Sequence, residues 1–230
     1  MDLSAVTVVL PALDEAAALP AALAGFPAGV DLLVVDNGST DATAAVAAAA
    51  GARVVAEPRR GFGAACWAGV QASPHARVVV FADADGSFDG ADLAAVAGPV
   101  LRAEADLVVG SRLAGGGRPR AMSALAAAEN RLLGLACRRL FGVPLSDLGP
   151  FRAIRRDALL GLGIRDRGQG WPLEMVGRAG LAGLRVLEVP VRYRPRAGGA
   201  SKVSGSLRGS ARAAAAMAAV TCRLLLEARG

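Results

Sequence analysis

The chain has 230 residues, with 26 basic and 20 acidic side chains, three cysteines and one histidine. This length suits a single domain with a substantial core, while the lone His75 and an odd cysteine count argue against histidine-based catalysis, a zinc site or a disulfide framework. The net charge of +6 comes almost entirely from arginine, whose guanidinium group suits phosphate oxygens. Arginine clusters such as 152–156 are nevertheless interpreted mainly as solvated surface. Because the chain has no recognised nucleic-acid-binding motif, we expect no nucleic acid partner.

Short apolar runs alternate with alanine-rich stretches through the first half of the chain. The runs 6–10, 31–36, 53–56, 77–82 and 106–109 predict buried strands, and the stretches 15–25, 40–50, 63–72 and 92–103 predict helices. This alternation favours an α/β fold with a mainly parallel sheet and helices on both faces. Ligands of such sheets bind beyond the carboxyl ends of the strands, so the residues that follow each run are the candidates for a site.

The rhythm changes after about residue 110. A glycine–arginine loop (115–120), a helix (123–140), a turn (143–150) and a further helix (155–160) precede a final strand (186–193), a glycine- and serine-rich loop (197–205) and a terminal helix (206–228). Pro190 interrupts the final strand, which suits an edge position. We expect one domain over the whole chain.

No stretch is long enough to cross a bilayer. The best candidate, residues 213–220, is bounded by Arg212 and Arg223 and falls short of the roughly 18 to 20 apolar residues that a spanning helix needs. The start of the chain lacks the basic region and cleavage site of a signal peptide. We therefore expect a cytoplasmic protein.

Two carboxylates follow the strand at 77–82. Side chains of an extended segment alternate between its faces, so Asp83 and Asp85 are expected on the same side, where they could share one hard cation such as Mg²⁺ or Mn²⁺. The alternative is a plain acidic turn at a strand end.

Acidic residues also follow the first two strands. After the strand at 31–36, Asn37 and Gly38 predict a tight turn, while helix capping accounts for Ser39 and Asp41. Capping does not account for Asp36, whose carboxylate could accept hydrogen bonds from a base or a ribose. After the first strand, Asp14 is a good candidate for an N-cap, and Glu15 is left for another use.

Three acidic strand ends in one parallel sheet resemble the glycosyltransferases of family 2, specifically the branch that includes dolichyl-phosphate mannose synthase and related bacterial enzymes. The matching stretches, in the order of the family, are 11–15, 34–43, 60–64, 83–85, 110–112, 146–152 and 198–202. The resemblance covers nearly the whole chain. It implies a fold of the GT-A type, in which residues 1–110 form the half that binds the nucleotide sugar, residues 111–205 form the acceptor side, and residues 206–230 form a C-terminal helix.

The resemblance also implies roles for individual residues. The residues expected to bind the donor are Pro11, Ala12, Glu15, Asp36, Gly38, Gly61, Gly63, Asp83, Arg196 and Lys202. Asp83 and Asp85 are expected to hold the divalent metal, Asp85 and Arg112 to take part in catalysis, and Arg112 to stand on the acceptor side. Relatives often carry a glutamine where this chain has Ser87, so water could replace that metal ligand.

The implied activity is inverting transfer of a hexose from a UDP- or GDP-linked sugar. The acceptor would be a polyprenyl phosphate or a small hydroxyl or phosphorylated molecule, and a binding relative without catalysis is the alternative. A hydroxyl acceptor needs a base. Glu174 is our candidate, because burial beside Trp171 could raise its pKa, although a glutamate at a helix N-terminus is the other interpretation.

The terminal helix raises the question of a membrane contact. Arg208, Arg212 and Arg223 beside apolar residues could hold it on an anionic membrane surface, at the inner face of the cell membrane. The alternative is a helix packed on its own domain. The sequence leaves open the donor base, the sugar, the acceptor and the oligomeric state.

Overall fold

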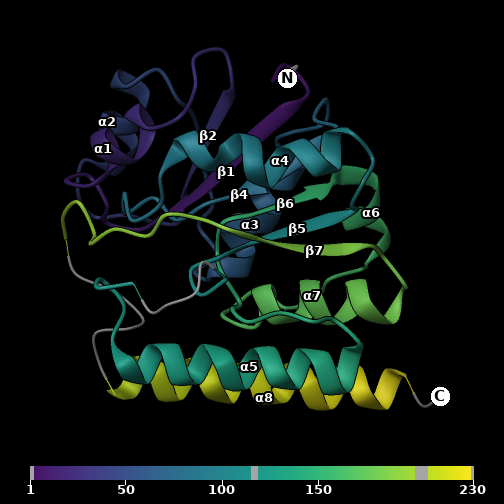
Figure 1. Ribbon diagram of the computed structural model, residues 1–230. Helices are drawn as coiled ribbons and strands as arrows, with labels where there is room; N and C mark the ends of the chain where they lie inside the picture. Colours follow the sequence, from purple (N-terminus) through teal and green to yellow (C-terminus); the bar gives the residue numbers. More distant parts are fainter. Residues whose placement is uncertain (1–2, 115–118, 200–206, 229–230) are drawn as a thin grey trace.

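The computed structural model describes residues 3–114, 119–199 and 207–228. Within these ranges, seven strands form one sheet in the order β3-β2-β1-β4-β6-β5-β7 (Figure 1). The strands are β1 (Val6–Ala12), β2 (Asp31–Asp36), β3 (Arg53–Ala56), β4 (Val78–Phe81), β5 (Leu107–Ser111), β6 (Arg152–Arg155) and β7 (Val186–Pro190). The strand that contains Pro190 lies at an edge, as predicted.

Parallel pairing dominates this sheet, as expected. β1 pairs in parallel with β2 and β4, β2 pairs with β3, and β5 pairs with β7. β6 is the exception among the described strands, because it runs antiparallel between β4 and β5. The sequence does not predict this strand, since two of its four residues, Arg152 and Arg155, are charged and it lacks the apolar run that marks its neighbours.

Helices cover both faces of the sheet (Figure 1). They are α1 (Leu19–Ala24), α2 (Thr43–Ala49), α3 (Phe62–Gln71), α4 (Leu93–Leu101), α5 (Ala124–Phe141), α6 (Arg156–Gly161), α7 (Trp171–Leu181) and α8 (Leu207–Glu227). Because strand side chains alternate between faces, Val8 and Leu10 join the core under α1 and α4, while Val9 joins the core under α3 and α7. The strand core is therefore apolar on both sides, which suits a parallel sheet.

The second half of the chain adds a layer of helices on one face. α7 begins at Trp171, has Glu174 in its first turn, as in the alternative interpretation of that residue, and buries Trp171, Leu173 and Met175. α5 and α8 lie on the side of α7 away from the sheet (Figure 1). Val220 and Leu224 of α8 are buried, so the terminal helix packs on its own domain along this face. Among the described helices, none combines the length and apolarity needed to cross a membrane.

Helices α1 and α2 begin later than predicted, because the loops that precede them bond to each other. Asp14, the predicted N-cap of the first helix, has a φ of 50° and accepts a hydrogen bond from the backbone N–H of Thr40 at 2.6 Å. Ser39, the predicted N-cap of the second helix, instead accepts one from the backbone N–H of Asp14 at 2.9 Å. Both N-cap predictions are wrong, and these contacts join the carboxyl ends of β1 and β2.

Candidate active site

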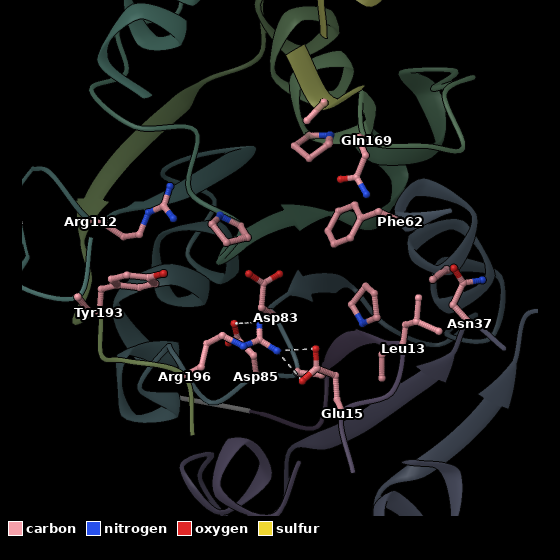
Figure 2. A pocket seen from close by; sticks show the side chains of 18 of the residues that line it. Leu13, Glu15, Asn37, Phe62, Asp83, Asp85, Arg112, Gln169, Tyr193 and Arg196 are labelled. Atoms are coloured by element: carbon pink, nitrogen blue, oxygen red, sulfur yellow. Dashed lines mark hydrogen bonds and ion pairs between the residues drawn. The ribbon is translucent and has the colours of Figure 1, made fainter. Parts of the chain in front are cut away.

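A cavity of about 480 Å³ opens beyond the carboxyl ends of the parallel strands (Figure 2). Seven of the predicted site residues line it: Pro11, Ala12, Glu15, Asp83, Asp85, Arg112 and Arg196. The sheet explains this grouping, because β1, β4 and β5 all end at the same edge. Lys202 and most of the loop 197–205 lie outside the described residues.

The two carboxylates after β4 face different partners. The backbone N–H of Ser87 donates to Oδ1 of Asp85 at 2.9 Å, and Arg196 donates to Oδ2 at 2.8 Å. Asp83 makes no such pair within the described residues, and burial together with the charge of Asp85 raises its pKa to about 7. An unpaired carboxylate beside a second one is a position that a cation would stabilise.

Arg196 reaches these carboxylates from the segment that follows β7. The backbone N–H of Arg194 donates to the carbonyl of Ser87 at 2.8 Å, and that of Ala197 donates to the carbonyl of Asp85 at 2.9 Å. These bonds hold the segment against the loop after β4. The Arg196 guanidinium then bridges Asp85 and Glu15, as the dashed lines in Figure 2 show. The positive charge of Arg196 thus lies between the acidic residues that follow β1 and β4.

The residues present fit a divalent cation that the substrate helps to hold. No group of three histidine, cysteine or acidic side chains gathers into a complete metal site within the described residues. Mg²⁺ commonly binds only one or two protein carboxylates and completes its coordination shell with substrate phosphates and water. Asp83 and Asp85 can supply these two carboxylates. The Ser87 hydroxyl, buried and without a hydrogen-bond partner in the described chain, fits a further oxygen ligand or a bound water.

Arg112 follows β5 and stands across the cavity from Glu15 (Figure 2). Its Nε and Nη2 donate to the two carboxylate oxygens of Asp147 at 2.8 and 2.7 Å. The guanidinium carbon lies 5.3 Å from the ring centroid of Tyr193. Although burial opposes it, the pairing with Asp147 raises the pKa of Arg112. Arg112 is thus a fixed, permanently charged group at the cavity wall.

The loops after β1 and β2 form the opposite end of the cavity. Leu13 and Asn37 line it, whereas Asp36 and Gly38 do not. Asp36 accepts a hydrogen bond from the backbone N–H of Ser39 at 2.9 Å, so the turn uses part of its carboxylate. Gly38 has a φ of +78°, a conformation that favours glycine.

Gly61 and Gly63 have a packing role rather than a place in the cavity wall. A Cβ added at Gly61 would lie 2.1 Å from the carbonyl oxygen of Arg167, and one at Gly63 would lie 2.8 Å from that of Asp166. The backbone N–H of Gly63 donates to the carbonyl of Gly168 at 3.0 Å. This contact joins the start of α3 to residues 166–168, and their neighbours Phe62 and Gln169 do line the cavity.

Comparison with known proteins places this chain in a family. The sequence profile described as "Glycosyl transferase family 2" matches residues 7–162, more than half of the chain. The chain belongs to glycosyl transferase family 2. It is therefore a glycosyltransferase, and the expectation drawn from the strand-end motifs is confirmed.

Individual relatives support the same assignment. An uncharacterized glycosyltransferase of Mycobacterium tuberculosis is 51% identical over 213 residues, which cover 90% of this chain and 93% of the relative. The undecaprenyl-phosphate mannosyltransferase of Micrococcus luteus is 31% identical over 228 residues, covering 90% of each. A solved structure of glucosyl-3-phosphoglycerate synthase from Mycobacterium tuberculosis with Mn²⁺, UDP-glucose and phosphoglyceric acid is 26% identical with a TM-score of 0.69, covering 94% of this chain and 79% of that one. The GT-A fold is thereby shown.

Glu174 does not have the environment expected of a base in this glycosyltransferase. Its side chain is fully buried but does not line the cavity. It accepts hydrogen bonds from the backbone N–H groups of Arg165 and Asp166, and it pairs with Arg178 and Arg223 at 2.8 Å each. Although burial alone would raise it, these donors lower the pKa of Glu174, so the predicted rise is wrong.

Two polar residues, Asn37 in the cavity wall and Arg152 outside the cavity lining, carry little signal in the sequence. Asn37, whose side chain bonds the backbone of Glu57, Arg59 and Gly61, reads as an ordinary turn residue. Arg152 reads as part of a surface cluster, but it is 2% exposed and donates to the carbonyls of Gly149 and Pro172. Its burial lowers its pKa to about 10. The position of Arg152 at the centre of the sheet explains both facts, and only the pairing of β6 reveals that position.

Proposed function

We propose that this glycosyltransferase moves a hexose from a UDP- or GDP-linked sugar to a polyprenyl phosphate, with inversion at the anomeric carbon. The observation that carries the proposal is the order of groups in one cavity. In the view of Figure 2, Glu15 and Leu13 lie below Asp83, whereas Arg112 and Phe62 lie above it. This order suits a donor whose diphosphate lies at the centre and an anionic acceptor beyond it.

The donor nucleoside would lie against the turns after β1 and β2, where Pro11, Ala12, Leu13 and Asn37 line the cavity. The diphosphate would then reach Asp83 and Asp85, which would hold Mg²⁺ or Mn²⁺. When bound, the cation supplies positive charge that stabilises the departing diphosphate. The solved glucosyl-3-phosphoglycerate synthase, which was crystallised with Mn²⁺ and UDP-glucose, supports this part of the proposal.

Arg196 would exchange its partners when the donor arrives. In the structure its guanidinium donates to Glu15 and Asp85. Guanidinium groups pair equally well with phosphate oxygens, so Arg196 would turn to the diphosphate once a cation takes its place beside Asp85. The segment after β7 keeps Arg196 within reach during this exchange.

The acceptor phosphate would meet Arg112. The second pKa of a phosphate monoester is about 6. An acceptor phosphate is therefore already largely ionised at neutral pH and needs no general base. One of its oxygens attacks the anomeric carbon, the bond to the diphosphate breaks, and the electron pair leaves with the nucleoside diphosphate. Arg112 would orient the nucleophile, and the apolar lining from Phe62, Pro172 and Met217 would suit an isoprenoid chain.

A lipid acceptor calls for a membrane contact, and we propose α5 as its main element. Leu125, Leu132 and Leu135 are 66%, 68% and 48% exposed on this helix, which also carries exposed Arg131, Arg138 and Arg139. An amphipathic surface of this kind suits an anionic membrane at the inner face of the cell. The earlier expectation rested on α8, but Arg223 of that helix pairs with the buried Glu174 and is directed inward.

Thermal unfolding with a panel of ligands tests the donor and the metal together. We expect UDP, GDP or one of their sugars to raise the Tm by several degrees with Mn²⁺ or Mg²⁺. EDTA and the variant Asp85→Asn should each remove the shift. Glu104→Gln, which alters an exposed ion pair with Arg102, is the matched control and should behave like the wild type. A lack of any metal-dependent shift would contradict the donor site.

Transfer of labelled sugar tests the acceptor. With the donor identified, polyprenyl phosphate should accept the sugar, whereas the corresponding free polyprenol should not, because it has no anionic oxygen for Arg112. Faster transfer to a small phosphorylated hydroxyl compound than to the lipid would overturn the lipid acceptor and leave the glycosyltransferase assignment intact.

A further inference from the structure

We infer that Asp147 and Glu188 are positioning residues that together fix the direction in which Arg112 faces the acceptor. This inference rests on the proposed role of Arg112 and extends it to two residues behind the cavity wall. We call the chain of contacts from Glu188 through Ser146 and Asp147 to Arg112 the arginine relay.

The first step of the arginine relay is the pair of Arg112 and Asp147. Asp147 is fully buried and accepts three hydrogen bonds from Arg112, from its backbone N–H, its Nε and its Nη2. A planar guanidinium has two edges that can each bind an anion in a bidentate manner. Asp147 takes the Nε–Nη2 edge, so the direction of the other edge, formed by Nη1 and Nη2, is fixed as well.

The second step holds Asp147 in place. Glu188 lies on β7, and its Oε1 accepts hydrogen bonds from the backbone N–H and the hydroxyl of Ser146, both at 2.8 Å, and from the backbone N–H of Asp147 at 3.1 Å. Three donors on one oxygen fix the start of the turn 146–149. Glu188 is opposite Val109 in the register of β5 and β7, so the turn is anchored to the sheet next to the strand that Arg112 follows.

The surroundings leave the relay little freedom. Gly149 lies so close to the end of β5 that an added Cβ would be 1.9 Å from the carbonyl oxygen of Gly110. The Ser111 hydroxyl lies 3.0 Å from that of Ser146. On the cavity side, the Tyr193 ring lies beside the guanidinium. With its carboxylate partner buried and its turn anchored, Arg112 presents one edge to an anion without a search through rotamers, which lowers the entropic cost of binding.

Kinetics with separate donor and acceptor titrations test the relay. Because the three bonds from Ser146 and Asp147 end on a single oxygen, the amide oxygen of Glu188→Gln can accept all of them, whereas Glu188→Ala accepts none. We expect Glu188→Ala to raise the KM for polyprenyl phosphate about tenfold, the effect of one charge-assisted hydrogen bond, with the donor KM unchanged. Glu188→Gln should restore the acceptor KM to near the wild-type value, and Asp147→Asn should be at least as impaired as the alanine variant.

The control is Asp106→Asn, at the opposite end of β5. Asp106 is also a buried carboxylate paired with arginine, but it lies away from the cavity lining. It should lower the Tm and leave both KM values unchanged. Equal changes in the donor and acceptor KM of Glu188→Ala, or no rescue by glutamine, would overturn the relay.

A second measurement tests the arginine relay independently of whether polyprenyl phosphate is the acceptor. The Nε–H resonance of Arg112, assigned by its absence in Arg112→Lys, should exchange slowly with solvent in the wild type and in Glu188→Gln, and quickly in Glu188→Ala. Slow exchange in the alanine variant would overturn the relay. Slow exchange in the wild type without any transfer to the lipid would instead refute only the proposed acceptor.

Discussion

The function open to a buried carboxylate depends on its hydrogen-bond and ion-pair partners, as Asp83, Asp85 and Glu174 show. Asp83 has no partner within the described residues and a pKa raised to about 7 by burial and by Asp85. Glu174 is buried as well, yet it receives two backbone donors and two arginines. The first carboxylate is available to a cation, and the second is occupied by the fold. We therefore propose that Glu174 positions the segment that leads to Gln169.

Glu174→Gln separates this positioning role from that of a base. We expect a loss of about 3 kcal/mol in the free energy of unfolding, the usual effect of removing one partner from a buried ion pair. Turnover at low temperature should persist, because Glu174 does not line the cavity. Denaturant unfolding and initial rates at 15 °C measure the two effects. Abolished turnover with unchanged stability would instead support the base role.

Gly61→Ala tests the contact between the start of α3 and residues 166–168. The added Cβ would lie 2.1 Å from a backbone oxygen, at a φ of +143° that suits glycine. We expect a loss of about 2 kcal/mol or more in the free energy of unfolding. Gly161→Ala in α6 is the matched control, because nothing lies within 4 Å of its added Cβ, and it should be neutral. Equal stability of the two variants would contradict the close approach.

At the scale of elements, one carboxylate joins three strands. Asp106, just before β5, accepts hydrogen bonds from the backbone N–H and the side chain of Arg185, before β7, and from the side chain of Arg155, at the end of β6. The end of the antiparallel β6 is thereby tied to the start of its neighbour β5 and, through Arg185, to the segment that precedes β7. The hydrogen bonds from Arg185 are the main cause that lowers the pKa of Asp106.

This shift predicts how stability depends on pH. A carboxylate with a lowered folded-state pKa contributes stability above its unfolded pKa of about 3.9 and loses that contribution as the pH falls through the folded value. Asp106→Asn should therefore unfold roughly 5 °C below the wild type at pH 7. The gap should narrow below about pH 4, as the wild-type carboxylate takes up its proton. A gap that stays constant down to pH 2.5 would contradict the shift.

At the scale of the whole molecule, the helices form an inner and an outer layer on one face of the sheet. α7 lies between the sheet and the outer pair α5 and α8 (Figure 1). α5 buries Ala127, Gly134, Cys137 and Phe141 on its inner side, and most of its leucines are exposed. The cavity extends to the outer layer, since Ala213 and Met217 of α8 line it.

Vesicle co-sedimentation tests the proposed membrane surface. Wild-type protein should bind vesicles that contain anionic lipid, and less protein should bind as salt is added. Leu132→Glu should reduce binding strongly, because it places a negative charge at the most exposed leucine of α5. Leu160→Glu, an exposed leucine of α6, is the control and should bind like the wild type. Equal binding by both variants would exclude α5 as the contact.

The sequence by itself determined the parallel half of the fold and the acidic pair. Apolar runs such as Val78–Phe81 specify buried strands because both of their faces must be covered, and Asp83 and Asp85, which follow this strand, lie at the edge of the sheet where the cavity opens. The motifs around them also indicated the family. These features are local, since each depends on a few neighbouring residues.

Only the tertiary structure decided which polar residues serve the fold. Arg152 and Glu174 look exposed or reactive in sequence, but both are buried in the fold, where Arg152 donates to the carbonyl of Pro172 and Glu174 pairs with Arg223 of the terminal helix. The Glu188 and Arg112 side chains are joined through a turn more than 30 residues from either of them. Hydrogen bonds and burial depend on distance in space, which the order of residues does not record, so the partners of a buried charge become visible only when the strands have paired.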